Sequence, residues 1–172
     1  DSGAFHAIME KMTTSAIDYL NYQIDEGVQA IQIFDSWVGC LSVSDYRNHV
    51  FAHSKKLIDS ISGKVPIIHF GTGNPSLLPL MTEAGGDVMA LDWRAPLKES
   101  WDLLGCKAVQ GNMDPIALFG SVDSVRQTAE SILEEVGGRP GHIFNLGHGI
   151  LPETPVENVK ALVEFVQGYE IS

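Results

Sequence analysis

The chain of 172 residues contains 44% hydrophobic and 19% charged residues, a composition typical of a globular protein, and we expect residues 1–172 to form a single domain. Its formal net charge of −11 disfavours binding to nucleic acid or to an anionic membrane surface, both of which require clustered lysines and arginines. No apolar run approaches the roughly 18 residues of a membrane helix, and two cysteines without metal-site or CxxC spacing indicate a reducing, cytoplasmic location.

Helical and β-favouring patterns alternate along the chain. Apolar residues recur every three or four positions from Phe5 to Ile24, which predicts an amphipathic helix over residues 4–25. Short β-favouring runs bounded by glycine, proline or polar residues predict five strands. The expected strands are residues 29–34, 66–70, 87–91, 107–110 and 142–146. The expected later helices are residues 45–61, 75–84, 96–104, 122–136 and 155–168.

This alternation predicts an α/β fold built from parallel βα units. Each expected strand is followed by Gly, Asn, Asp, Ser or His, as in (β/α) barrels, whose active-site loops follow the strands. A complete eight-stranded (β/α)8 TIM barrel needs about 250 residues. We therefore expect about five βα units, or half a barrel, with an exposed sheet edge.

Several helix starts carry capping residues. Asn74-Pro75 and Asp114-Pro115 combine an N-cap residue with a proline at the first helical position, and Ser121 is expected to cap the helix that follows it. Thr154 precedes Pro155 in the same way, and Glu157 is placed to complete a capping box with it. Each cap predicts a helix that begins at a defined residue.

His148 is the first candidate for a functional residue. We expect residues 142–146 to form a buried strand, and Gly147 and Gly149 to break it by adopting backbone angles closed to other residues. His148 then lies on a loop at the carboxyl end of a strand, where α/β proteins bind ligands. The alternative is that its ring only packs within the loop.

Other polar residues also follow strands. The Ser36 hydroxyl could hold a substrate carboxylate or cap a turn, and the absence of a GxSxG motif argues against a nucleophile. His69 lacks further zinc ligands at suitable spacing, so we expect no metal. Asp92 and Arg94 are expected to form an ion pair that braces loops. Asn112 and Gln110 could contact either a ligand or neighbouring loops.

Five ordered motifs together resemble the uroporphyrinogen decarboxylase family. They are QIFDSWVG at 32–39, HFGTGN at 69–74, LDWR at 91–94, VQGNMDP at 109–115 and FNLGHGILPETPVENV at 144–159. Members of this family are about twice as long, and the chain resembles their C-terminal half. The resemblance therefore implies a fragment or one piece of a longer chain, folded as the C-terminal half of a TIM barrel.

The resemblance also implies a function. Family members remove carbon dioxide from the four acetate side chains of uroporphyrinogen III, giving coproporphyrinogen III for haem biosynthesis, without a metal or another cofactor. Ser36 and His148 match positions that contact carboxylates of the tetrapyrrole, and Phe34 matches a wall residue of the pocket. The catalytic arginines and aspartate lie in the other half, so none is certain here and this chain alone is expected to be inactive. The full-length protein is expected to be a homodimer.

Two alternatives stay open. The related corrinoid and thiol methyltransferases use a His-x-Cys pair near His69, whereas residue 71 here is glycine. A half-barrel that binds a tetrapyrrole or another partner without catalysis is the other alternative. An upstream coding segment with paired arginines and an aspartate would distinguish the decarboxylase from both.

Overall fold

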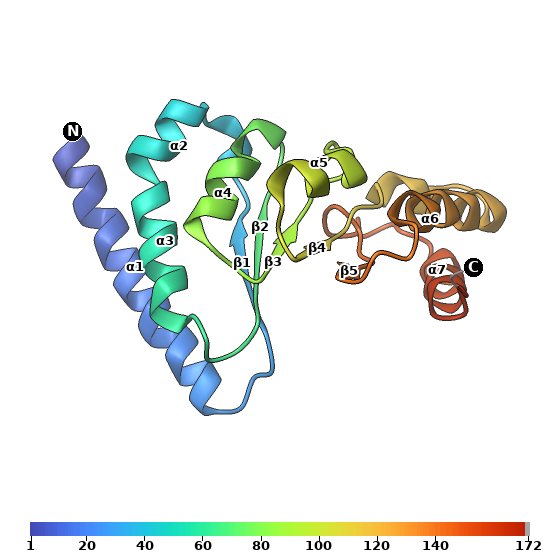
Figure 1. Ribbon diagram of the computed structural model, residues 1–172, viewed down its shortest axis with the longest axis horizontal. Coiled ribbons are helices and arrows are strands. Elements are labelled where there is room, and N and C mark those ends of the chain that lie inside the picture. The colour runs from blue at the N-terminus through green and yellow to red at the C-terminus, as the bar shows by residue number, and fades with distance from the viewer. Residues whose placement is uncertain (171–172) are drawn as a thin grey trace. The chain divides into compact units, whose positions relative to one another are not determined.

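The computed structural model describes residues 1–170 of an α/β chain (Figure 1). The strands follow the order β1-β2-β3-β4-β5 in a five-stranded sheet, which confirms the expected class and the number of strands. The chain divides into two compact units, Asp1–Met89 and Ala90–Ser172, here the N-terminal and C-terminal units. The expectation of a single domain over residues 1–172 stays a prediction. No helix of the described residues is long and apolar enough to span a membrane.

The N-terminal unit packs helices against two parallel strands, which pair in register from Ile31 with Ile67 to Asp35 with Gly71. Figure 1 shows α1 running alongside α3. Buried Ile31, Ile67 and Ile58 form the centre of its core. Its elements are α1 (Ser2–Asp25), β1 (Ile31–Asp35), η1 (Val38–Cys40), α2 (Val43–His49), α3 (Phe51–Ile61), β2 (Ile67–Gly71), η2 (Pro75–Leu77) and α4 (Leu78–Ala84).

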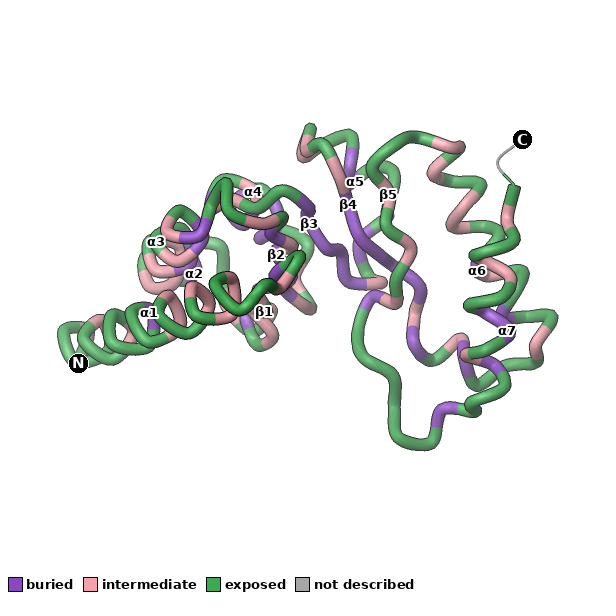
Figure 2. The backbone as a smooth tube through the Cα atoms, turned by 90° about the horizontal axis from the view of Figure 1, so that it is seen from below, coloured by how far each residue is buried: buried purple, intermediate pink, exposed green. Residues whose placement is uncertain are grey.

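In the C-terminal unit, α6 and α7 pack over a core that includes Met113, Val125 and Leu162. Strands β4 and β5 are parallel, and Figure 2 shows buried residues along β4. Strand β3 (Val88–Ala90) spans the boundary between the units, and the Leu91 N–H just after it donates to the Gln110 carbonyl at 2.8 Å. The remaining elements are α5 (Leu97–Leu104), β4 (Ala108–Gln110), η3 (Pro115–Phe119), α6 (Val122–Val136), β5 (His142–Ile143) and α7 (Val156–Gln167).

Most expected elements are confirmed to within about two residues, and two depart in form. The helix expected over residues 45–61 is two helices, α2 and α3, that meet at Val50, whose φ and ψ of −120° and −44° interrupt regular helix. The helix expected over residues 75–84 begins as the 3-10 turn η2.

The prediction of a buried strand over residues 142–146 is wrong in both length and burial. Regular pairing covers only His142 and Ile143, and it resumes as a single parallel bridge between Met113 and Leu146. The Ile143 side chain is 42% exposed. Strand β5 is the last in the strand order, so within the described residues no strand covers its outer edge.

Three of the expected helix caps are present and one is not. Asn74, Asp114 and Ser121 accept backbone N–H bonds at the starts of their helices, as expected. The capping box of Thr154 and Glu157 is wrong, because Pro155 is the N-cap of α7 and no side chain caps this helix. The Thr154 hydroxyl oxygen instead accepts the Leu151 N–H at 3.1 Å, which closes the preceding turn.

Candidate substrate-binding residues

Phe34 and Ser36 lie at the carboxyl end of β1. The Phe34 side chain is 62% exposed, and its ring meets the ring of Phe70, its partner in β2, edge to face at 5.8 Å between centroids. Ser36 is half-buried in the turn after the strand, and its carbonyl accepts a hydrogen bond from the Thr72 hydroxyl. The loops after β1 and β2 are therefore tied together at Ser36. The 3-10 turn η1 that follows has no side-chain cap, so the Ser36 hydroxyl stays a candidate ligand group.

Gly39 allows this close loop contact. A Cβ atom added at Gly39 would lie 2.1 Å from the Thr72 carbonyl oxygen, a distance no side chain tolerates. The Asn74 side-chain amide donates to the Leu41 carbonyl at 3.0 Å and joins the same loops a second time. The backbone that carries Ser36 is thus fixed from the neighbouring loop.

Between Phe34 and Ser36, Asp35 directs its carboxylate into the protein. Its Oδ2 atom lies 3.0 Å from His69 Nε2 and accepts hydrogen bonds from the Tyr46 and Ser54 hydroxyls at 3.3 Å each. Burial, and secondarily the charge of Asp35, raises the pKa of Tyr46, which therefore remains a neutral donor. One carboxylate thus joins β1 to β2, α2 and α3.

His69 is fully buried and serves this network. Its Nδ1 atom lies 3.2 Å from the carbonyls of Met81 and Gly85, which only accept hydrogen bonds. Nδ1 must therefore carry a proton, and Nε2 faces the Asp35 carboxylate. Sequence reasoning weighed His69 only as a metal ligand and missed this role.

His148 lies in the C-terminal unit on the loop after β5, where it is exposed. Its ring meets the Trp93 ring edge to face at 6.1 Å between centroids. The Gly147 N–H donates to the Met113 carbonyl at 2.7 Å, and a Cβ atom added at Gly147 would lie 2.3 Å from the Trp93 backbone nitrogen. The loop is therefore held by backbone contacts on both sides of Gly147.

The expected reason for the two glycines beside His148 is wrong. Neither Gly147 nor Gly149 has a positive φ, so neither supplies a backbone conformation closed to other residues. Gly147 is required because Trp93 approaches its backbone so closely, whereas nothing lies within 4 Å of a Cβ atom added at Gly149. The constraint on the His148 loop is steric and comes from the loop after β3.

The expected ion pair between Asp92 and Arg94 is present. Arg94 Nη1 donates to Asp92 Oδ2 at 2.7 Å, and the Arg94 backbone N–H donates to Oδ1 at 2.8 Å. The Asn112 amide donates to the carbonyls of Asp92 at 3.1 Å and Ala95 at 2.6 Å. Asn112 thus braces neighbouring loops, one of its two expected roles. Gln110 is buried, and its role stays open.

His142 at the start of β5 also belongs to the C-terminal unit. Its Nε2 atom lies 2.7 Å from the Gly111 carbonyl, to which it donates a hydrogen bond. Burial lowers the pKa of His142, and the bond to Gly111 opposes this shift only in part. The neutral imidazole is therefore favoured in the folded chain.

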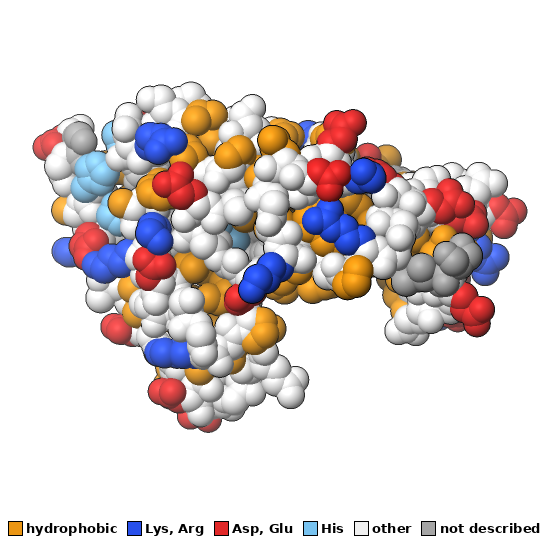
Figure 3. Space-filling view, viewed as in Figure 1, with side chains coloured by type: hydrophobic (Ala, Val, Ile, Leu, Met, Phe, Trp, Pro, Cys, Tyr) orange, Lys and Arg blue, Asp and Glu red, His pale blue; other side chains and the backbone are white. Residues whose placement is uncertain are grey.

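Three further histidines, His6, His49 and His53, lie together, and the sequence did not indicate this group. Figure 3 shows histidine side chains gathered near the start of α1. The His6 ring stacks on His53 and is tilted against His49, each at 5.6 Å between centroids, and His6 Nδ1 lies 3.3 Å from His53 Nε2. Within residues 1–170, no group of three or more His, Cys, Asp or Glu residues is arranged to hold a metal ion.

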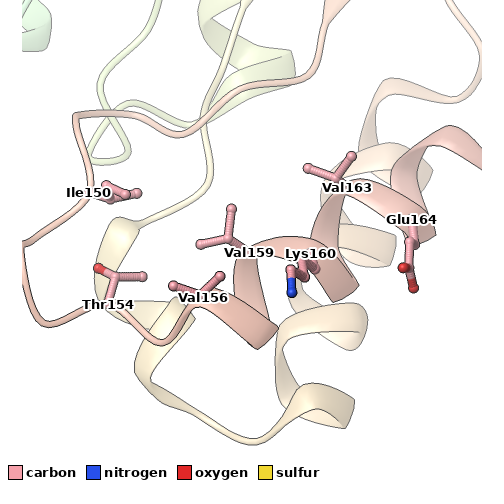
Figure 4. Close-up of a pocket in the computed structure, with 7 residues that line it drawn as sticks. All are labelled: Ile150, Thr154, Val156, Val159, Lys160, Val163 and Glu164. Atoms are coloured by element: carbon pink, nitrogen blue, oxygen red, sulfur yellow. The ribbon is translucent and has the colours of Figure 1, made fainter.

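A groove of about 460 Å³ runs along α7 and the loop before it (Figure 4). Its lining is mainly apolar and includes Ile150, Val156, Val159 and Val163. Lys160 is the cation in its lining, and it pairs with Glu157 at 3.0 Å. A polycarboxylate finds little to bind there, and neither His148 nor Trp93 lines the groove.

The expected site residues are therefore distributed over both units. Phe34 and Ser36 belong to the N-terminal unit and His148 to the C-terminal unit. Phe34 lies on strand β1, and Ser36 and His148 lie on the loops that follow β1 and β5. That all three contact one substrate stays a prediction.

Comparisons with known proteins cover nearly the whole chain. The family model described as uroporphyrinogen decarboxylase (URO-D) matches residues 1–169. Proteins named uroporphyrinogen decarboxylase from Koribacter versatilis and Carboxydothermus hydrogenoformans are each 50% identical, over 96% and 95% of this chain but only 48% and 47% of their own lengths. The chain thus spans about half the length of the curated relatives it matches.

A solved structure agrees with the fold. A methyltransferase from Methanosarcina mazei matches with a TM-score of 0.78 and 26% identity, over 90% of this chain and 46% of that protein. The match covers about half of the methyltransferase, which agrees with the expected half of a barrel. The match of the family model over residues 1–169 shows that the chain belongs to the uroporphyrinogen decarboxylase family.

Proposed function

We propose that the protein containing this chain decarboxylates the four acetate side chains of uroporphyrinogen III and releases coproporphyrinogen III. The observation that carries the proposal is 50% identity over nearly the whole chain to proteins named for this activity. In the proposed reaction, protonation of a pyrrole carbon creates an electron sink for the electrons that each departing carbon dioxide leaves behind. The protein then supplies orientation, proton transfer and charge stabilisation, without a cofactor.

Ser36 and His148 are proposed to hold carboxylates of the tetrapyrrole, and Phe34 to line the pocket. Two features support these roles. The Phe34 and His148 side chains are exposed although their backbones are held by strand pairing and close loop contacts. Preorganised groups of this kind lose little entropy when a ligand binds. The remaining acid and cationic groups are proposed to come from the other half of the protein.

The alternative of a corrinoid or thiol methyltransferase is less well supported, although one structural relative is named a methyltransferase. His69 already bonds to Asp35 and to two carbonyls, and residue 71, where those methyltransferases have a cysteine, is glycine. A binding module without catalysis remains the alternative from another functional class, and an activity measurement separates it from the proposal.

The decisive experiment joins this chain to the N-terminal half of the Carboxydothermus hydrogenoformans relative. The chimaera is purified from a host lacking its own decarboxylase and incubated anaerobically with uroporphyrinogen III, and the products are resolved by chromatography after oxidation. We expect coproporphyrinogen from the chimaera and none from the 172-residue chain alone. A folded chimaera that binds the substrate without releasing carbon dioxide would favour the binding module.

The same proposal includes a homodimer and a cytoplasmic location for the full-length protein. Cys40 and Cys106 are both free thiols, which is the state that the reducing cytosol maintains. Sedimentation of the active chimaera at several concentrations tests the dimer.

A further inference from the structure

Two loops of the C-terminal unit hold a guanidinium, an indole and an imidazole together. The Arg94 guanidinium carbon lies 3.7 Å from the centre of the Trp93 ring, and the His148 ring meets that indole at an interplanar angle of 86°. Arg94 and His148 are exposed, and Trp93 is half-buried. We call Trp93, Arg94 and His148 the Arg94 cluster.

A buried carboxylate orients Arg94. The Asp92 side chain is 5% exposed and accepts bonds from both the side chain and the backbone of Arg94. The Arg94 side chain is 50% exposed and makes no other hydrogen bond or ion pair with residues 1–170. One nitrogen of its fork is thus fixed, and the other donors remain available to a ligand. The Asn112 bonds to Asp92 and Ala95 hold the loop itself in place.

Another stacked arginine shows the contrast. Arg139 lies 3.9 Å over the ring of Trp101, but that indole is almost fully buried and donates to the Cys106 carbonyl. The Arg139 guanidinium pairs with Asp102, an exposed carboxylate that also binds Lys98. Arg139 therefore covers a core residue within a surface ion network. Arg94 instead pairs with a buried carboxylate beside an exposed imidazole.

We propose that the Arg94 cluster is a carboxylate-binding subsite, in which Arg94 supplies the cationic fork and His148 a second polar contact. A planar guanidinium matches the two oxygens of a carboxylate, and the half-buried Trp93 indole supports this guanidinium by stacking against it. The ligand is then a carboxylate side chain of a tetrapyrrole polyacid. This identification of the ligand rests on the proposed function, whereas the geometry of the cluster does not.

The test titrates the folded 172-residue chain with uroporphyrin, the stable oxidised form of the proposed substrate, and follows quenching of tryptophan fluorescence. Arg94→Gln removes the cationic fork and is expected to weaken binding roughly 10-fold, as expected for the loss of a charged hydrogen bond. Arg94→Lys keeps the charge without the fork, and its affinity for uroporphyrin should lie between those of the unsubstituted chain and of Arg94→Gln. Arg126→Gln is the matched control, because Arg126 is exposed on α6 and makes no ion pair with the described residues.

Equal affinities of Arg94→Gln and Arg126→Gln would overturn the subsite, and so would failure of the unsubstituted chain to bind uroporphyrin. Circular dichroism verifies the fold of each variant, and Arg94→Lys carries the test if Arg94→Gln does not fold. Activity of the chimaera separates the two proposals. If the chimaera is active and Arg94→Gln binds uroporphyrin as the unsubstituted chain does, only the subsite proposal is refuted. If the chimaera is inactive and binding depends on Arg94, only the proposed function is refuted.

Discussion

Gly147 lies so close to Trp93 that an added Cβ atom would sit 2.3 Å from the Trp93 backbone nitrogen and 2.8 Å from its Cβ. Backbone atoms of two loops thus touch where any other residue would separate them. This contact places the His148 loop against the loop that carries Arg94. The glycine of the NLGH sequence is therefore explained by a neighbour more than 50 residues away in the chain, at Trp93.

We therefore expect Gly147→Ala to destabilise the chain by about 1–3 kcal/mol, the range typical of overpacking, because backbone must move to admit the methyl group. Gly149→Ala is the matched control, since nothing lies within 4 Å of its added Cβ atom. That control should change the free energy of unfolding by less than about 0.5 kcal/mol. Urea denaturation of both variants measures the difference, and equal midpoints would show that the two loops separate readily.

The Asp35 network predicts a second effect on stability. Asp35→Asn removes the carboxylate that faces His69 Nε2 and the hydroxyls of Tyr46 and Ser54. We expect a loss of about 1–3 kcal/mol, because groups in the network are left with poorer partners. Asp59→Asn is the control, since its pair with Lys55 is exposed and such pairs contribute about 0–1 kcal/mol. Similar losses in the two variants would contradict a central role for Asp35.

His142 predicts how stability depends on pH. Its pKa is lowered in the folded chain, so the unfolded chain binds its proton first as the pH falls below the ordinary value of about 6.5. Its contribution to stability is therefore complete above that pH and is lost as the pH falls toward the folded pKa. His142→Gln keeps a donor for Gly111 without the titration. Urea unfolding at pH 7.5 and pH 5 should show a smaller acid loss in this variant, and an identical loss would exclude His142 as a source.

Local patterns predicted most of the fold, because each βα unit is encoded by apolar periodicity and short turn signals. They failed for residues 142–146, where β-favouring side chains cannot reveal whether another strand covers the edge. They failed again at Thr154, whose hydroxyl had two possible local partners and bonds to Leu151 rather than capping α7. Propensity reports what a segment can form, and its neighbours determine which form persists.

In the candidate site, contacts between residues close in the sequence were predictable, and contacts between distant residues were not. The ion pair of Asp92 and Arg94 was predictable because the two residues are separated by one position. The partners of Asp35 lie 11, 19 and 34 residues away, so no local pattern connects them. A histidine and a tyrosine at apolar positions after β1 were the only available signal, and the same signal accompanies ordinary core residues.

The last prediction concerns His148 in the active chimaera. The Gly147 contacts fix the loop, so His148→Asn should alter the ligand contact without moving the backbone. Asparagine keeps a donor but places it differently, and we expect activity to fall about 10- to 100-fold, or roughly 1.4–2.8 kcal/mol in transition-state stabilisation. Partly decarboxylated intermediates should also accumulate in a different pattern, because each acetate must be presented in turn. Gly149→Ala again serves as the control within the same loop. An unchanged rate and pattern would reduce His148 to loop packing, whereas complete loss of turnover with binding intact would identify it as the proton donor.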